Sequence, residues 1–334
     1  MPVARTVSDA RFVRDLLLGL CLVTAGAGAA EPAKRAERLL GQVSEAAKQL
    51  DYRGEFIYVH GGGLDVMRIV HRSTAHGEAE RLVSLSGPAR EVIRDGTRVT
   101  CTFADEREVL VEQRQPSDFM SLALSEPVSK IERHYVIALA GKDRVADRDT
   151  HVLTITPKAN DRYSHRLWID EASNLLLRSA VIGEGGRVLE QVVFTRVQIG
   201  GEIPPAALKP RFAGEGYTWF TNREGGTGAK ELEKRDFTVA WVPSGFALKD
   251  QHTQELATSR KPVRHVAFSD GLAMVSVFVE EIAGEEPPLQ GFSTLGAVNA
   301  FSRAEGEHQI TVVGEVPQGV ARRIAASVSI SQAH

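Results

Sequence analysis

The fold can be inferred from one segment, Gly54-Glu-Phe-Ile-Tyr-Val-His-Gly-Gly-Gly-Leu-Asp-Val-Met-Arg-Ile-Val-His-Arg72. Residues 54–60 and 64–72 are rich in β-branched and aromatic side chains, and the three glycines at 61–63 separate them. Two such runs on either side of a glycine turn predict an antiparallel β-hairpin. Similar runs continue along the chain, so we expect a domain made mainly of antiparallel strands.

Strand-like runs recur at short, even spacing, separated by turn residues such as Asp95-Gly96. They predict strands at 80–86, 90–94, 97–103, 108–112, 151–157, 165–170, 175–183 and 188–199. One apolar stripe predicts a helix before the hairpin; its members are Ala36, Leu40, Val43, Ala47 and Leu50. Residues 116–135 break the strand rhythm and favour a short helix or flap. We therefore expect a long sheet that curls and carries its helices on the concave face.

The rest of the sequence predicts a linker and a second, smaller α+β domain. Residues 200–228 hold seven glycines and three prolines, which is typical of a linker, although its aromatic residues are too apolar for a pure spacer. Strands are expected at 237–242, 263–268, 273–280 and 308–313, with a turn at Asp270-Gly271. A helix should begin at Pro317 and continue through Val320, Ile324 and Val328. The predicted boundaries are 31–203 for the first domain, 204–235 for the linker and 236–334 for the second domain.

The first thirty residues are typical of a secretory signal peptide. Arginines precede an apolar run from Leu16 to Ala25, and small residues follow it. We expect cleavage after Ala29 or Ala30 and export of the mature chain; a buried helix or an uncleaved anchor is the alternative. Cleavage would remove Cys21 and leave Cys101, in a predicted strand, as a small core residue; an intermolecular or reactive thiol is the alternative. No apolar run of 18 or more residues follows Ala30, so no transmembrane helix is expected.

Composition and motifs argue against several function classes. The 334-residue chain has a formal charge of −3, which does not suggest electrostatic binding to nucleic acid. The segment Gly291-Phe-Ser-Thr-Leu-Gly296 has the wrong spacing for a nucleophile elbow, and Gly141-Lys142 lacks the serine or threonine of a phosphate-binding loop. His60, His71 and His76 are the best metal candidates, but they lack regular ligand spacing. We predict no enzyme activity, no cofactor and no metal site.

Several segments together resemble the RseB/MucB family. They are Tyr52-Arg-Gly-Glu-Phe-Ile-Tyr58, Met67-Arg-Ile-Val-His-Arg72, Glu80-Arg-Leu-Val-Ser-Leu-Ser-Gly87, Arg90-Glu-Val-Ile-Arg94, Tyr163-Ser-His-Arg-Leu-Trp-Ile-Asp170, Leu175-Leu-Leu-Arg178, Gly296-Ala-Val-Asn-Ala-Phe-Ser-Arg303 and Val312-Val-Gly-Glu-Val-Pro317. The resemblance covers nearly the whole mature chain, in order. It implies a first domain like that of lipoprotein carriers, an unclosed antiparallel β-barrel capped by helices.

The resemblance implies a periplasmic regulator of the envelope stress response. Such a protein binds the periplasmic segment of a membrane-spanning anti-sigma factor of the RseA/MucA type and protects it from site-1 proteolysis. Lipopolysaccharide or its acyl chains release the regulator. A homodimer is possible.

Candidate contact residues follow from this expectation. Phe56 and Tyr58 share one strand face, and the apolar residues of the segment after Pro116 could form a flap; the lipid-pocket candidates are Phe56, Tyr58, Phe119, Met120, Leu122 and Leu124. For each of these residues the simpler alternative is that it fills a core. The candidates for anti-sigma binding are aromatic residues of the linker and the second domain, namely Tyr217, Trp219, Phe220, Trp241 and Phe278.

Two other function classes remain open. A periplasmic lipoprotein or lipid carrier would need only the first domain, so a well-formed second domain argues against it. A secreted hydrolase is less favoured because the catalytic motifs are missing.

Overall fold

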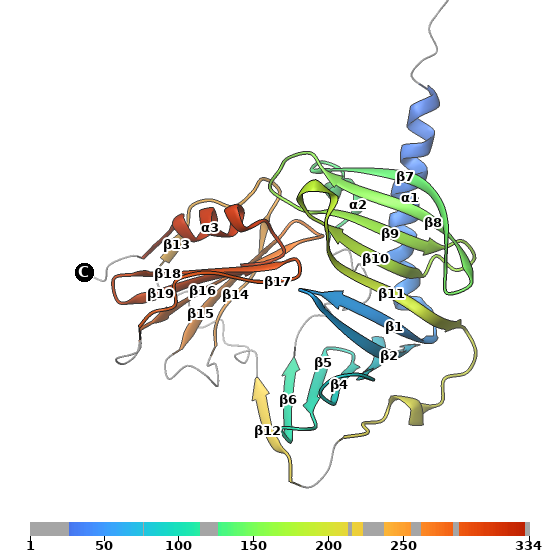
Figure 1. The fold of residues 1–334 in the computed structure, drawn as a ribbon, viewed down its shortest axis with the longest axis horizontal. Helices are drawn as coiled ribbons and strands as arrows, with labels where there is room; N and C mark the ends of the chain where they lie inside the picture. The colour runs from blue at the N-terminus through green and yellow to red at the C-terminus, as the bar shows by residue number, and fades with distance from the viewer. Residues whose placement is uncertain are drawn as a thin grey trace, which may run out of the picture.

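The computed structural model describes residues 27–75, 77–113, 126–212, 216–222, 237–254, 262–282 and 287–330. Within them the chain forms two domains, each built on a mostly antiparallel sheet (Figure 1). Among these residues, no helix combines the length and the apolar character that crossing a membrane requires.

The first domain is a sheet of twelve described strands in the order β12-β6-β5-β4-β3-β2-β1-β11-β10-β9-β8-β7. The strands are β1 (Tyr52–His60), β2 (Gly63–Thr74), β3 (Gly77–Ser84), β4 (Arg90–Asp95), β5 (Arg98–Phe103), β6 (Glu108–Gln113), β7 (Tyr135–Val145), β8 (Arg148–Pro157), β9 (Ser164–Asp170), β10 (Leu176–Ile182), β11 (Val188–Ile199) and β12 (Thr218–Asn222). β12 and β7 lie at opposite ends of this order, so the sheet is not closed. The predicted unclosed, mainly antiparallel sheet is confirmed.

The expected hairpin holds the centre of this sheet. β1 pairs with β2 along its whole length, from Tyr52 opposite His71 to His60 opposite Gly63, and its other edge pairs with β11. The chain thus adds β2 to β6 on one side of β1 and β7 to β11 on the other. Gly54 permits this packing because a Cβ there would lie 2.7 Å from the Phe194 ring of β11.

Helix α1 (Ala27–Gln49) covers one face of the sheet near β7 (Figure 1). Its apolar stripe packs with buried residues of β7, β8 and β9 in a cluster of Ala36, Leu39, Leu40, Val43, Ile131, Tyr135, Ile137, Leu153, Ile155, Leu167, Ile169 and Leu176. A second cluster, containing Phe56, Ile69, Trp168 and Phe194, draws on β1, β2, β9 and β11. Successive side chains of β9 point to opposite faces of the sheet, so Leu167 and Ile169 join the first cluster and Trp168 joins the second. Besides α1, the described elements of this domain outside the sheet are α2 (Val128–Ile131), η1 (Glu184–Gly186) and η2 (Pro205–Leu208).

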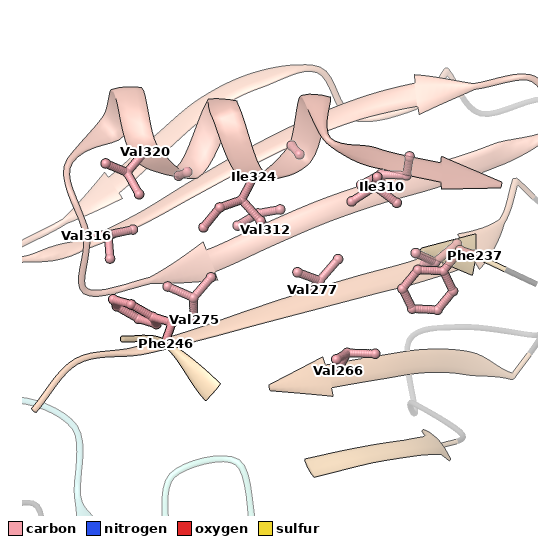
Figure 2. Packing of buried hydrophobic residues seen from close by; sticks show 14 of the residues in the cluster. Phe237, Phe246, Val266, Val275, Val277, Ile310, Val312, Val316, Val320 and Ile324 are labelled. Atoms are coloured by element: carbon pink, nitrogen blue, oxygen red, sulfur yellow. The ribbon is translucent and has the colours of Figure 1, made fainter. Parts of the chain in front are cut away.

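The second domain is a six-stranded sheet covered on one face by a helix. Its order is β14-β15-β16-β19-β18-β17. The elements are β13 (Phe237–Val239), β14 (Ala247–Gln254), β15 (Val263–Ser269), β16 (Met274–Glu281), β17 (Gly291–Leu295), β18 (Val298–Glu305), β19 (His308–Gly314), α3 (Gln318–Ala326) and β20 (Val328–Ile330). Figure 2 shows Val320 and Ile324 of α3 facing Val275, Val277 and Val312 of the sheet. This packing forms the core of the second domain.

The structure corrects several sequence-based boundaries. Helix α3 ends at Ala326, and Val328 belongs to β20, which pairs with β13. The stretch predicted as a linker contributes β12, which pairs parallel with β6. Strands β7, β14, β17 and β18 were not predicted. Helix α1 begins before the expected cleavage point, at Ala27, and residues 1–26 lie outside the described residues.

Candidate functional site

The two domains meet at a buried ion pair. Arg162 Nε donates to Asp270 Oδ2 at 2.7 Å, and the Tyr135 hydroxyl donates to the same oxygen at 2.8 Å. The Arg162 and Asp270 side chains are only 2% and 0% exposed. Arg162 also donates to the Ser244 carbonyl through Nη2. Each charged group therefore has several hydrogen-bond partners, the condition under which a buried ion pair is tolerated.

The turn between β15 and β16 positions Asp270. Its other oxygen, Oδ1, accepts the backbone N–H groups of Leu272 at 3.0 Å and Ala273 at 2.9 Å. Gly271 has a φ of +102°, and a Cβ there would lie 2.8 Å from the Glu126 side chain of the first domain. Leu272 packs against the cluster beneath α1. The predicted Asp-Gly turn thus contacts the first domain in two ways: Asp270 pairs with Arg162, and Leu272 packs against apolar residues.

A second contact brings two carboxyl groups together. Glu190 Oε1 of β11 accepts the Ala297 N–H of the second domain at 3.0 Å, and the Tyr58 hydroxyl hydrogen-bonds to Glu190. Burial raises the pKa of Glu315 to about 7, and the negative charge of Glu190 adds to this shift. Burial and the same glutamates raise the pKa of Tyr58 as well. This part of the junction therefore holds a carboxyl group that titrates near neutral pH.

Histidines and amides complete the junction. Burial lowers the pKa of His165 to about 4, and burial together with the Arg162 charge lowers the pKa of His134. Asn299 Nδ2 donates to the Tyr163 hydroxyl at 2.9 Å, which links the domains a third time. The junction is therefore held largely by polar contacts, as is common between the domains of one chain.

An exposed aromatic pair lies on β12, at the other end of the first sheet. Trp219 is 52% exposed and Phe220 is 39% exposed. Trp219 lines an open pocket of about 270 Å³ together with Ile93, Asp95, Arg98, Thr100, Thr102 and Pro210. β12 is the last described strand at this end of the sheet, a position at which an extended peptide could add by strand pairing.

A second apolar edge lies on β17. All five of its residues are exposed, including Phe292 and Leu295, and nearby Leu289 is 70% exposed. The Phe292 ring packs against Phe301 of β18 with centroids 4.7 Å apart. β17 is the last strand in the order of its sheet, so this edge could also accept an extended segment.

The sequence-based lipid candidates are spread over different environments. Phe56 is fully buried and meets Phe194 edge to face, at 5.8 Å between centroids. Tyr58 stacks on His60 at 4.4 Å and belongs to the domain junction. The other four, Phe119, Met120, Leu122 and Leu124, lie outside the described residues. Their role in lipid binding stays a prediction.

The structure does not bring the five anti-sigma candidates together. Tyr217, Trp219 and Phe220 lie at or beside β12, in the first domain's sheet. Trp241 packs against the second-domain core and under the Arg323 guanidinium, 3.8 Å from the ring centroid. Phe278 lies on β16 and stacks on His265, with ring centroids 4.5 Å apart. Their role in partner binding also stays a prediction.

The histidines of the first hairpin have protein partners. His60 Nε2 lies 2.9 Å from Asp65 Oδ2, and His71 Nδ1 lies 2.9 Å from the Leu50 carbonyl. His76 lies outside the described residues. A different group, missed in the sequence, gathers in the second domain: Asp250, His252 and His265. The two histidines are thirteen positions apart in the sequence, and only the pairing of β14 with β15 places them opposite each other.

Comparison with known proteins gives matches over both domains. The model of the MucB/RseB N-terminal domain matches residues 35–212, and that of the MucB/RseB C-terminal domain matches residues 231–329. The sigma factor AlgU regulatory protein MucB of Pseudomonas aeruginosa is 30% identical over 94% of this chain and 95% of that protein. The sigma-E factor regulatory protein RseB of Escherichia coli K12 is 25% identical over 96% of this chain and 98% of that protein.

Solved structures agree with this result. MucB in the Pseudomonas aeruginosa MucA/MucB complex superposes with a TM-score of 0.70 at 29% identity, covering 90% of this chain and 100% of that chain. A crystal structure of MucB gives a TM-score of 0.63 at 27% identity, over 89% of this chain and 98% of that chain. The likeness extends through both domains, in sequence and in fold. The chain belongs to the MucB/RseB family.

Proposed function

We propose that this protein is a periplasmic negative regulator of the envelope stress response. It binds the periplasmic segment of a MucA/RseA-type anti-sigma factor and protects that segment from site-1 proteolysis. Lipopolysaccharide or an acyl chain releases it. It acts by binding and not by catalysis.

The observation that carries the proposal is the likeness, over both domains, to MucB as it is found in complex with MucA. A lipid carrier would need only the first domain, so the well-packed second domain, with six described strands and a covering helix, argues against that alternative. The polar junction between the domains supports the release step. A lipid that favours another arrangement of the two domains would weaken the binding of a peptide that requires the present arrangement.

The first prediction concerns the partner and the release signal. Residues 31–334 should bind a fluorescently labelled periplasmic segment of a MucA/RseA-type anti-sigma factor, and added lipid A should reverse the binding. Fluorescence anisotropy titrations with and without lipid A measure both effects. A scrambled peptide is the control, and light scattering on the same samples tests whether the protein forms a homodimer. Lipid uptake without any peptide binding would favour the carrier alternative instead.

The second prediction concerns the exposed aromatic pair on β12. The double variant W219A/F220A should bind the labelled segment at least about tenfold more weakly, because exposed aromatic side chains commonly dominate a peptide interface. The matched control is Val136→Ala, which removes an equally exposed apolar side chain from β7 at the opposite end of the sheet. Equal affinity of W219A/F220A and the unaltered protein would remove β12 from the proposed contact surface.

A further inference from the structure

The edge of the second domain brings three metal-ligating side chains together. β14 pairs antiparallel with β15, and His252 lies directly opposite His265. Asp250 precedes His252 by two residues, so both side chains project from the same face of β14. A carboxylate oxygen and one ring nitrogen from each histidine all lie within 4.8 Å of one another. The rings of His252 and His265 meet edge to face, with centroids 4.9 Å apart.

His265 is oriented as a metal-ligating histidine is. Its Nε2 lies 2.8 Å from Ser276 Oγ, and its ring stacks on Phe278 at an interplanar angle of 8°. Ligating histidines are usually held in this way, by a hydrogen bond from the second ring nitrogen. In the tautomer whose Nε2–H donates a hydrogen bond to Ser276 Oγ, Nδ1 carries a lone pair.

That lone pair has no other use within the described part of the chain. His265 Nδ1 is buried and has no hydrogen-bond partner there. A buried nitrogen without a partner costs free energy, so it favours a ligand that fills the position.

The donor set selects the class of metal. Two imidazole nitrogens and one carboxylate oxygen suit Zn²⁺, with water in the fourth position, whereas Ca²⁺ and Mg²⁺ prefer oxygen ligands. Ligands of one tetrahedral zinc ion lie about 3.4 Å apart, given bonds of about 2.1 Å. Asp250 Oδ2 already lies 2.7 Å from His252 Nδ1, and a shared zinc ion would replace this hydrogen bond. No two of the three donor atoms need to approach by more than about 1.4 Å. Asp250 is exposed and His252 is only half-buried on the outermost strand, so side-chain rotation can supply this movement.

The site lies on the face of the sheet that α3 does not cover. Val266, next to His265 in β15, points to the core beneath α3, so His265 points to the other face (Figure 2). Phe278 and Ser276 of β16 alternate in the same way with the buried Val275, Val277 and Val279. An ion held there would link β14 to β15 through side chains as well as through backbone hydrogen bonds.

We propose that Asp250, His252 and His265 form a zinc-binding site at the β14–β15 edge of the second domain. This proposal does not depend on the proposed regulatory function, since it concerns a single domain and needs no partner.

Isothermal titration calorimetry of residues 31–334 with ZnCl₂ tests the site. Any affinity tag is removed beforehand, because histidine tags bind zinc themselves. We expect one ion per chain, with no binding of Mg²⁺ or Ca²⁺, and a thermal midpoint that rises with zinc concentration. Replacing Zn²⁺ with Co²⁺ should give the visible absorption of a tetrahedral site. Functional metal sites bind zinc with affinities far tighter than about 1 mM. If no zinc binds at concentrations up to about 1 mM, the proposal is overturned.

Variants assign the ligands. Asp250→Asn and His252→Ala change an outer strand and should leave the fold intact in EDTA, while each weakens zinc binding by about tenfold or more. His265→Gln should abolish binding; circular dichroism checks its fold because the ring is stacked on Phe278. His308→Ala, in β19 of the same sheet, is the matched control and should bind normally. Unchanged affinity in both Asp250→Asn and His252→Ala would show that zinc binds elsewhere.

Discussion

Replacement of Asp270 with alanine is expected to lower the free energy of unfolding by about 3–5 kcal/mol, the cost of breaking a buried ion pair by removing one partner. The Arg162 guanidinium would remain 2% exposed with its main counter-charge gone. The Tyr135 hydroxyl would lose its acceptor, and the turn would lose the oxygen that holds the N–H groups of Leu272 and Ala273. Urea unfolding of residues 31–334, monitored by tryptophan fluorescence, measures this loss as a shift of the first unfolding transition to lower urea concentration.

Two variants make this result specific to the buried pair. Arg68→Ala removes an exposed ion pair with Glu55 and should cost less than about 1 kcal/mol. The double variant D270A/R162M removes both charges and should recover part of the lost stability, because no uncompensated charge is then buried. If Asp270→Ala unfolds within about 1 kcal/mol of the unaltered protein, the ion pair does not hold the domains together.

Local sequence predicts the Asp270-Gly271 turn but not the role of Asp270. The dipeptide between two strand-like runs is a sufficient turn signal, and the structure confirms it. The partners Arg162 and Tyr135 lie 108 and 135 residues earlier in the chain, so no periodicity or spacing connects them to the turn. The position of the domain junction depends on such distant pairs and could not be predicted.

Strand prediction failed where a strand has little alternation of apolar and polar residues. β7 contains the polar run Gly141-Lys-Asp-Arg144, all of which is exposed. β17 is exposed throughout, so no buried face marks it in the sequence. By contrast, β1 and β2 carry a buried face on both sides of a glycine turn and were predicted closely.

The candidate sites also depend on contacts between residues that are far apart in the sequence. His60, His71 and His76 were metal candidates because they are close along the chain. Of these, His60 contacts Asp65 and His71 contacts the Leu50 carbonyl, so the two have separate partners. His252 and His265 come together only through the register of β14 and β15. Trp219 and Phe220 were recognisable because they are aromatic residues in a glycine-rich stretch, although their place on the edge of the first sheet was not.

The protein should become less stable as the pH rises from about 4.5 to about 7, through the titration of Glu315. An unfolded glutamate gives up its proton near pH 4.5, whereas burial and Glu190 raise the pKa of folded Glu315 to about 7. Between these values the folded state binds the extra proton, so each unit of pH increase lowers the free energy of unfolding by up to about 1.4 kcal/mol. Below pH 4.5 the effect vanishes, and above pH 7 it is complete.

Comparison with Glu315→Gln isolates this contribution. The glutamine amide carries no charge, so the variant should be more stable than the unaltered protein at pH 8 by about 1–3 kcal/mol and equal to it at pH 4.5. The buried His134 and His165 have lowered pKa values and act in the opposite direction below pH 6.5, but they are present in both proteins and cancel in the difference. Glu307→Gln, an exposed change in the turn between β18 and β19, is the control. A constant difference between Glu315→Gln and the unaltered protein from pH 4.5 to 8 would contradict the assignment.

The position of Glu315 gives this titration a structural consequence. Glu190 and Tyr58 face it from β11 and β1 of the first domain, while Glu315 belongs to the second. The negative charge of ionised Glu315 therefore repels Glu190 across the junction and weakens the contact between the domains. Small-angle scattering should show a larger radius of gyration at pH 8 than at pH 6 in the unaltered protein. In Glu315→Gln the radius should not change with pH, because the repulsion between the two carboxylates is absent.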